Sequence, residues 1–157
     1  MAILVLGATS EIARENVEIF AAHGERMILA ARNVSALQVP VGASVQCVYY
    51  NAEETFQTAL NAEMFWRQCV EIARVNWKEE IHGVYIAQGF LPSGDSDRWG
   101  EEIGRTIFLN FTSITFFLEA VARWYEAHAE RFSQVKSGSG SECDSERSTE
   151  HNLEYNL

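Results

Sequence analysis

The sequence has little positive charge and no long apolar run. Lys and Arg number 12 against 22 Asp and Glu, which gives a net charge of −10. An acidic surface repels the phosphates of nucleic acids and of anionic membranes, so we expect neither as a partner. No stretch approaches the roughly 20 apolar residues of a membrane-spanning helix. The apolar run at the amino terminus is too short for the core of a secretion signal. These absences predict a cytoplasmic protein.

Cysteine and histidine are too scattered to predict a disulfide or a metal site. The three cysteines, Cys47, Cys69 and Cys143, lie far apart and include no Cys-x-x-Cys. We interpret them as reduced thiols, and the first two as residues of the core. The four histidines form no i, i+4 pair, so no metal is expected.

Apolar runs alternate with helical patterns along residues 1–132. Runs typical of buried strands cover about residues 3–6, 27–31, 44–50 and 81–87. Apolar residues recur at helical spacing over about residues 10–23, 53–78 and 100–131, the second of these as a short helix and then a longer one. This order predicts an α/β fold, a Rossmann-like doubly wound parallel sheet of about four strands joined by right-handed crossovers.

The composition changes after Phe132. Residues 133–157 have almost no aliphatic side chains and are rich in Ser, Gly and Glu. Such a segment cannot bury enough apolar surface to offset the entropy lost on ordering it. We therefore predict one domain, residues 1–132, followed by a disordered tail, residues 133–157.

A Gly-Ala-Thr-Ser turn that begins at Gly7 joins the first strand to the first helix. A glycine here lets the chain turn sharply and lets its backbone approach a pyrophosphate, while the helix offers free N–H groups. The dinucleotide fingerprint has two further glycines, and this chain has Glu11 and Ala13 in their places. From the residues alone, a phosphate site and a plain tight turn stay open as alternatives.

The strand ends together resemble the short-chain dehydrogenase/reductase (SDR) superfamily. The resemblance lies in GATSEIA from Gly7, in AARN at the end of the second strand, in AQG after the fourth, and in LNFTS around Asn110. It covers about residues 2–131, and it is nearest to members with a GATSEIA or GGTSEIG motif, which tolerate Glu11. The resemblance implies an NAD(P)-dependent oxidoreductase that transfers a hydride between nicotinamide and an alcohol or ketone. A dinucleotide and a small-molecule substrate are the partners it implies.

The resemblance assigns cofactor contacts to the ends of all four strands. Arg32 follows the second strand with no acidic neighbour, and a guanidinium suits the 2′-phosphate of NADP, so NADP is favoured over NAD. An ordinary surface arginine is the alternative. Asn51 and Ala52 stand where the family contacts adenine. The full set that the resemblance implies is Gly7, Thr9, Ser10, Glu11, Ile12, Arg32, Asn33, Asn51, Ala52, Ala87, Gln88 and Gly89, with Asn110 as the asparagine of the catalytic tetrad.

The catalytic pair of the family is missing from this sequence. In the family a tyrosine acts as acid/base, and a lysine four residues later lowers its pKa from about 10. No Tyr-x-x-x-Lys occurs here; Tyr125, for example, is followed by Ala129. Ser133 and Ser137 stand where the fifth strand should begin, but no strand pattern surrounds them. We expect cofactor binding with little or no turnover.

Three functions stay open. The chain is an NAD(P)-dependent oxidoreductase by descent, a non-catalytic nucleotide-binding or sensing module, or a fragment that self-associates as a homo-oligomer through its last helix. A truncated or frame-shifted gene product would explain both the missing pair and the change of composition after Phe132. A longer reading frame that encodes a fifth strand and Tyr-x-x-x-Lys would support this hypothesis.

Overall fold

The computed structural model describes residues 1–92, 94 and 98–129. The chain divides into two compact units, Met1–Arg123 and Trp124–Leu157. The sheet and the cleft described below belong to the first unit, and residues 124–129 are the described part of the second. The predicted tail, residues 133–157, lies outside the described residues, as do Ser133 and Ser137. The domain boundary at residue 132 therefore stays a prediction.

Four parallel strands form one sheet with the order β3-β2-β1-β4. The strands are β1 (Ala2–Leu6), β2 (Arg26–Ala31), β3 (Val45–Tyr49) and β4 (Ile81–Ile86). The predicted Rossmann-like α/β fold class is confirmed, and the described residues form the four strands that the sequence predicts. The strand order reverses between β1 and β4, and doubly wound sheets bind ligands beside such a reversal, beyond the carboxyl ends of the strands.

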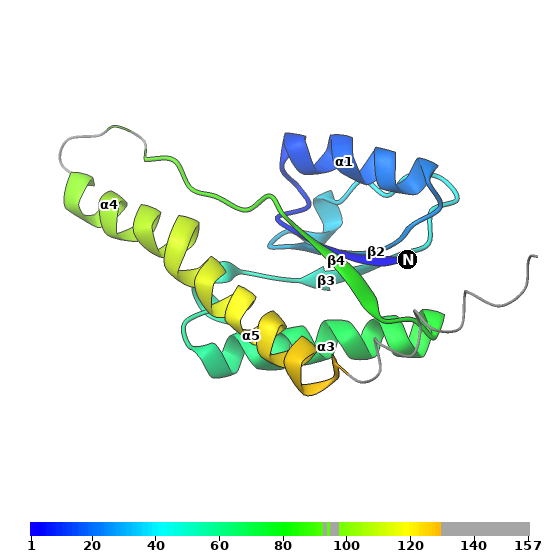
Figure 1. Ribbon diagram of the computed structural model, residues 1–157. Coiled ribbons are helices and arrows are strands. Elements are labelled where there is room, and N and C mark those ends of the chain that lie inside the picture. The colour runs from blue at the N-terminus through cyan, green and yellow to red at the C-terminus, as the bar shows by residue number, and fades with distance from the viewer. Residues whose placement is uncertain (93, 95–97, 130–157) are drawn as a thin grey trace, which may run out of the picture. The chain divides into compact units, whose positions relative to one another are not determined.

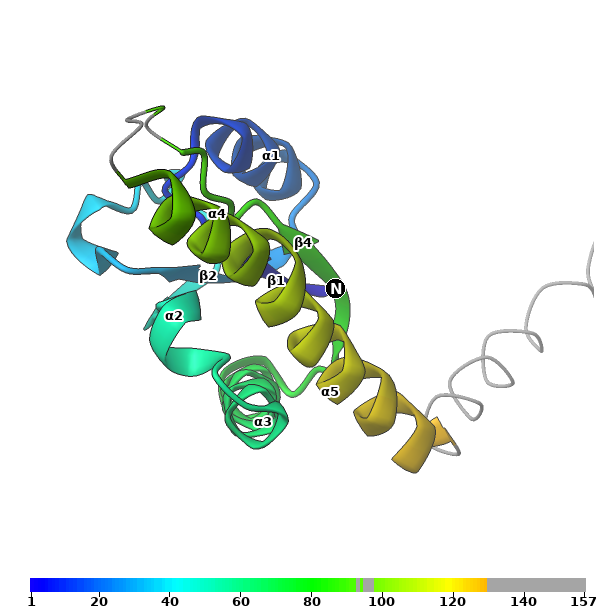
Figure 2. The ribbon, with the colours of Figure 1, turned by 90° about the vertical axis from the view of Figure 1, so that its left-hand side faces the viewer.

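Helices cover both faces of this sheet (Figure 1). Helix α1 (Glu11–Ala22) lies on one face and α3 (Ala59–Trp77) on the other, and the short helix α2 (Ala52–Thr55) precedes α3 (Figure 2). A 3₁₀-helical turn, η1 (Val34–Ala36), follows β2. In the described part of the chain, no helix combines the length and the apolar character needed to cross a membrane.

The long helix predicted over residues 100–131 contains a π-helical segment. Helix α4 (Trp99–Ile107) leads into the π-helical η3 (Phe108–Thr112), and α5 (Ser113–Ala127) follows. A π-helical segment widens the turn, so the side chains that follow it face a direction different from that of a continuous α-helix. Apolar periodicity alone did not predict this segment, which contains Asn110.

The central strands are buried on both faces, as their continuous apolar runs predict. On one face, residues of the strands pack against α1 in a cluster formed by Val5, Ala8, Ala13, Val17, Met27 and Leu29. Successive strand residues point to opposite faces. The alternate residues Leu4, Leu6 and Ile28 therefore face the other side, and each is at most 1% exposed.

An aromatic cluster anchors α5 to α2 and α3. Phe117 stacks on Phe56 with ring centroids 5.1 Å apart, and it also contacts Phe65 and Trp66. Tyr50, directly after β3, packs against Phe56 and Phe65. Because large buried rings contribute strongly to stability, this cluster holds the last helices close to the carboxyl end of β3.

The prediction that Cys47 is a core residue is wrong, whereas Cys69 is buried in α3 as predicted. Strand β3 is at the edge of the sheet. Of the face formed by Val45, Cys47 and Tyr49, only Val45 packs against the cluster under α1. Cys47 and Tyr49 are exposed because α1 does not cover this half of the edge strand.

Candidate functional site

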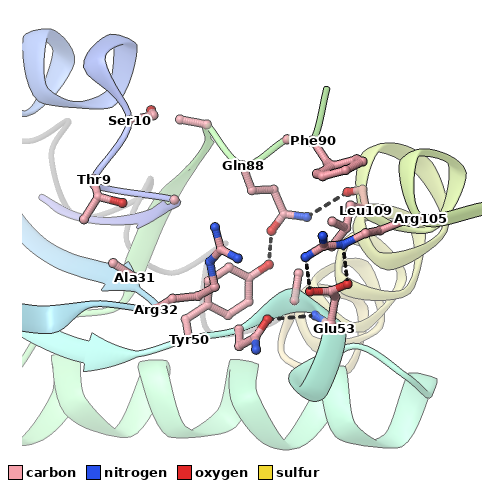
Figure 3. Close-up of a pocket in the computed structure, with 15 residues that line it drawn as sticks. Thr9, Ser10, Ala31, Arg32, Tyr50, Glu53, Gln88, Phe90, Arg105 and Leu109 are labelled. Atoms are coloured by element: carbon pink, nitrogen blue, oxygen red, sulfur yellow. Dashed lines mark hydrogen bonds and ion pairs between the residues drawn. The ribbon is translucent and has the colours of Figure 1, made fainter. Parts of the chain in front are cut away.

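The carboxyl ends of all four strands open into one cleft of about 200 Å³. Its walls come from the segments that follow the strands and from α4 and η3: Gly7, Thr9, Ser10, Ala31, Arg32, Tyr50, Asn51, Ala52, Glu53, Ala87, Gln88, Gly89, Phe90, Arg105 and Leu109. Figure 3 shows Thr9 and Ser10 at one end and Glu53 and Arg105 at the other, with Arg32 between the two ends.

Nine of the twelve predicted cofactor-binding residues line this cleft: Gly7, Thr9, Ser10, Arg32, Asn51, Ala52, Ala87, Gln88 and Gly89. Glu11, Ile12 and Asn33 do not. The Glu11 side chain is 93% exposed, and its carboxylate lies 4.0 Å from Arg14 on the surface of α1. Ile12 is 70% exposed, and the Asn33 Oδ1 accepts a 2.7 Å hydrogen bond from Ser35.

Gly7 brings the first turn against the backbone that leaves β4. Its φ is +76°, which L side chains rarely adopt. A Cβ at Gly7 would lie 2.7 Å from the Gln88 N and 2.9 Å from the Ala87 carbonyl carbon. The Gly7 and Ala8 amides both donate to the Ala30 carbonyl, at 2.9 and 3.1 Å, so the same turn is also tied to β2.

The amino terminus of α1 lies beside one end of the cleft, where its N-cap residue Ser10 is part of the lining. The Ser10 Oγ accepts a 3.1 Å hydrogen bond from the Ala13 N–H and caps the helix. The amides of Glu11 and Ile12, in the first turn, have no acceptor within the helix. Free amides and the helix dipole suit a phosphate.

Arg32 lines the cleft with an unpaired guanidinium. The residue is exposed, and it makes no hydrogen bond or ion pair with any residue that the structure describes. The lining contains two guanidinium groups, those of Arg32 and Arg105, and one carboxylate, that of Glu53. It therefore carries a net positive charge in a chain of net charge −10. A guanidinium without a carboxylate partner suits a phosphate group.

A hydrogen-bond network joins the ends of β3 and β4 to η3. The Tyr50 hydroxyl donates to the Gln88 Oε1, and the Gln88 Nε2 donates to the Leu109 carbonyl at 3.1 Å and to the Ser113 Oγ at 3.0 Å. Burial raises the pKa of Tyr50 above its ordinary value. An acid/base tyrosine needs a lowered pKa, so Tyr50 has the wrong environment for that role.

Asn110, which the resemblance places in the catalytic tetrad, holds the segment after β4. Its Oδ1 accepts a 2.8 Å hydrogen bond from the Phe90 N–H, and its Nδ2 donates to the Phe90 carbonyl at 2.9 Å. It also borders a second, more open hollow, together with Leu91 and Ile114. The described contacts of Asn110 are therefore those of a residue that positions a loop, and its catalytic role stays a prediction.

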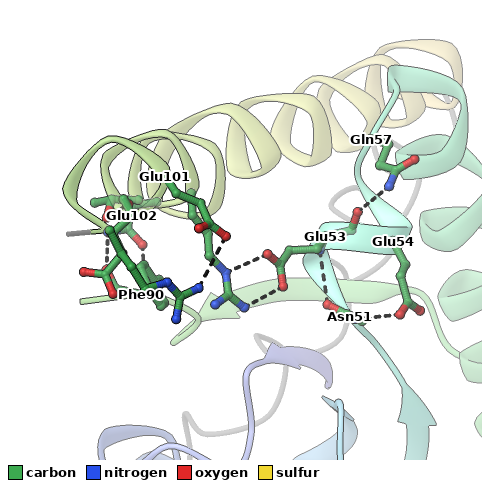
Figure 4. A network of polar contacts seen from close by, with 11 residues as sticks. Asn51, Glu53, Glu54, Gln57, Phe90, Glu101 and Glu102 are labelled. Atoms are coloured by element: carbon green, nitrogen blue, oxygen red, sulfur yellow. Dashed lines mark hydrogen bonds and ion pairs between the residues drawn. The ribbon is translucent and has the colours of Figure 1, made fainter. Parts of the chain in front are cut away.

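The Asn51 amide, predicted to contact adenine, caps α2. Its Oδ1 accepts a 3.2 Å hydrogen bond from the Glu53 N–H, and its Nδ2 donates to Glu54 at 2.9 Å (Figure 4). A carbonyl oxygen accepts two hydrogen bonds, so the same oxygen keeps one lone pair for a ligand.

An ion pair closes the end of the cleft opposite α1. The Arg105 Nε and Nη2 donate to the two carboxylate oxygens of Glu53, at 2.7 and 2.8 Å. The Arg105 guanidinium carbon lies 4.5 Å from the centre of the Phe90 ring. The hydrogen bonds from Arg105 lower the pKa of Glu53 below its ordinary value.

Six residues of the lining are outside the predicted set: Ala31, Tyr50, Glu53, Phe90, Arg105 and Leu109. Tyr50 precedes Asn51 in the sequence, and Phe90 follows Gly89. Because Asn51 and Gly89 are predicted site residues, these two neighbours could also have been predicted to line the site. Arg105 carried no such signal, because it lies 52 residues from Glu53 in the sequence.

No protein-family model matches this sequence, and a comparison with curated proteins finds no match. Solved structures do match. A short-chain type dehydrogenase/reductase from Mycobacterium ulcerans has 20% identity and a TM-score of 0.58, over 78% of this chain and 45% of that one. Serine dehydrogenase from Escherichia coli has 17% identity and a TM-score of 0.60, over 80% and 56% of the two chains.

A variant of actinorhodin polyketide ketoreductase, solved with NADPH, has 18% identity and a TM-score of 0.61, over 76% of this chain and 45% of that one. This chain thus spans about half the length of the structures it resembles. Over that part, the chain has the fold of the short-chain dehydrogenase/reductases.

Proposed function

We propose that this chain binds a nicotinamide dinucleotide in the cleft at the carboxyl edge of the sheet, and that it prefers NADP(H) to NAD(H). The observation that carries the proposal is the convergence of four strand ends on one cleft, with the amino terminus of α1 beside it and with Arg32, which pairs with no described residue, in its lining. The likeness in fold to a ketoreductase solved with NADPH supports it.

Each part of the dinucleotide has a matching group in the cleft. The turn from Gly7 to Ser10 and the first amides of α1 would hold the pyrophosphate. The Arg32 guanidinium would hold the 2′-phosphate, and Asn51 and Ala52 would face the adenine. Ala87, Gln88 and Gly89 would border the cofactor from the β4 side. The bound dinucleotide would supply the hydride.

The reaction class that this fold suggests is hydride transfer between nicotinamide and an alcohol or ketone. We expect little or no turnover from this chain, because it has no Tyr-x-x-x-Lys and because the pKa of Tyr50 is raised. The same two observations favour a second candidate, a nucleotide-binding module without catalysis. A panel of carbonyl substrates with NADPH separates the two: sustained oxidation of NADPH would support the enzyme.

Arg32→Asp tests the preference for NADP(H). The substitution removes the partner of the 2′-phosphate and adds a carboxylate that can accept hydrogen bonds from the ribose hydroxyls of NADH. We expect NADPH affinity to fall about 10-fold or more, with NADH affinity equal or higher. Titration of each cofactor, followed by its fluorescence, measures both constants.

Arg67→Asp is the matched control, because it makes the same change of charge on α3, where Arg67 pairs with Glu63. It should leave the NADPH-to-NADH ratio as in the wild type. An unchanged ratio in Arg32→Asp would overturn the role of Arg32. Absence of saturable binding of either cofactor at millimolar concentration would overturn the proposal as a whole.

A further inference from the structure

The Glu53–Arg105 ion pair fixes a planar cation in the wall of the cleft. The pair joins α2 to α4, and both side chains are partly exposed, 36% for Glu53 and 39% for Arg105. Ion pairs with this exposure add little to the stability of a fold. Two parallel hydrogen bonds nevertheless hold the guanidinium plane in one orientation.

The surroundings of Arg105 leave it available to a flat ligand. The guanidinium carbon lies over the face of the Phe90 ring, 4.5 Å from the ring centre. Glu53 occupies two of its N–H groups along one edge. Arg105 itself lines the cleft, as Figure 3 shows. A guanidinium backed by an aromatic ring is a good platform for stacking a second planar ring.

The chemistry of this end of the cleft suits a base better than a phosphate. The Glu53 carboxylate repels anions, and Ala52, Phe90 and Leu109 add apolar surface. The opposite end is lined by Thr9 and Ser10 and lies beside the amino terminus of α1, whose first amides and dipole attract anions. A nucleotide would therefore lie with its phosphates toward α1 and its base toward Arg105.

We propose that Arg105 is the purine-binding residue of this cleft, with its guanidinium stacked on the adenine ring, and that Glu53 is a positioning residue that acts through Arg105. This inference rests on the proposed function and extends it: the base is recognised by a residue of α4 that is held in place from α2. The ligand class is an adenine nucleotide, bound by its purine at this end.

Titration calorimetry with adenosine 2′,5′-bisphosphate tests the inference, because this probe carries the adenine and the 2′-phosphate without the nicotinamide. We expect Arg105→Met and Arg105→Lys each to weaken binding about 10-fold or more, since both lose the planar guanidinium. Glu53→Gln should weaken binding by a smaller factor. It should have no further effect in the Arg105→Met background, because it acts through Arg105.

Arg67→Met is the matched control. Arg67 also donates from Nε and Nη2 to a carboxylate, that of Glu63, at 3.0 and 2.6 Å, but on α3 and outside the cleft. The Arg67→Met variant should bind the probe with the affinity of the wild type. Thermal unfolding followed by circular dichroism checks that each variant is folded. If both Arg105 variants unfold, the Glu53→Gln variant still tests the inference, because it should bind the probe more weakly than the wild type.

The outcomes separate this inference from the proposed function. Wild-type affinity in Arg105→Lys would mean that Arg105 acts as a charge on a phosphate, which overturns stacking. Tighter binding by Glu53→Gln would mean that its carboxylate only repels the ligand, which overturns its positioning role. Unchanged binding in Arg105→Met overturns the inference and leaves the dinucleotide proposal standing. If the wild type binds neither the probe nor NADPH, the proposed function itself fails.

Discussion

At Gly7, the lack of a side chain matters for packing as much as for the turn. A positive φ is also found at Gly24, but a Cβ at Gly24 would have nothing within 4 Å, whereas at Gly7 it would meet the Gln88 backbone at 2.7 Å. The turn thus brings the end of β1 against the segment that leaves β4, and these two segments form adjacent parts of the cleft wall.

Gly7→Ala and Gly24→Ala separate the two effects. An alanine with positive φ costs about 1–2 kcal/mol, so we expect about 1 kcal/mol at Gly24 and roughly 3 kcal/mol at Gly7, where the backbone must also shift. Urea unfolding of both variants measures the free energies. Equal losses in the free energy of unfolding at the two positions would show that the close approach to the Gln88 backbone does not add to the cost of the substitution at Gly7.

The fit of the first turn to a phosphate depends on where one side chain points. Glu11 replaces a glycine of the dinucleotide fingerprint, and its carboxylate would repel a pyrophosphate if it faced the cleft. Its side chain is instead 93% exposed and near Arg14, outside the cleft lining. The turn therefore keeps its backbone donors while the charge lies in solvent.

At the scale of the elements, the π-helical η3 holds the loop that follows β4. Asn110 uses its oxygen and its nitrogen on the backbone of Phe90, and Phe90 in turn covers the Arg105 guanidinium. Gln88, from the same loop, donates to the Leu109 carbonyl in η3. The wall that carries Arg105 is therefore built jointly by η3 and by the loop after β4.

Asn110→Ala should loosen this loop. It leaves a partly buried N–H and carbonyl of Phe90 without partners, so we expect a loss of about 1–3 kcal/mol in the free energy of unfolding. Hydrogen exchange of the Phe90 amide, followed by NMR, should be faster than in the wild type. Asn76→Ala is the control, since Asn76 donates to the Ile72 carbonyl from an exposed position, and its effect should stay within about 0.5 kcal/mol. Unchanged exchange at Phe90 in Asn110→Ala would contradict this account of the loop.

At the scale of the whole molecule, the described chain has the fold of the SDRs over about half of their length, and α4 and η3 present an apolar strip to solvent. The strip consists of Trp99, Ile103, Ile107 and Phe111, which recur at every fourth residue and are each between 38% and 66% exposed. Contiguous exposed apolar surface of this kind marks sites of association.

We expect the protein to self-associate through this strip. Phe111→Glu places a charge at its carboxyl-terminal end, on the most exposed of its residues, so the average mass in sedimentation velocity should fall toward that of a monomer. Val75→Glu is the control, because Val75 is similarly exposed but lies on α3, and it should associate like the wild type. A wild-type protein that stays monomeric at all concentrations tested would contradict this prediction.

Much of the fold was predictable because its signals are local. Each strand is a short apolar run, and each helix repeats its apolar residues at helical spacing, so the order of the elements follows from neighbouring residues. In a parallel sheet the carboxyl ends of all strands lie at the same edge. The predicted site residues follow the strand ends, so nine of them line one cleft. Cys47 was mispredicted because its exposure depends on how far α1 extends over an edge strand.

The sequence by itself determined the fold class, the glycine turn and the lack of a Tyr-x-x-x-Lys pair, since these are properties of residue types and short spacings. Only the tertiary structure decided that Glu11 points into solvent, that Asn110 holds Phe90, and that Arg105 closes the cleft with Glu53. The reason is physical: the last two contacts join segments that are far apart in the sequence, so each partner depends on how the helices pack. The direction of Glu11 depends on how α1 is rotated on the sheet, which its neighbours in the chain do not fix.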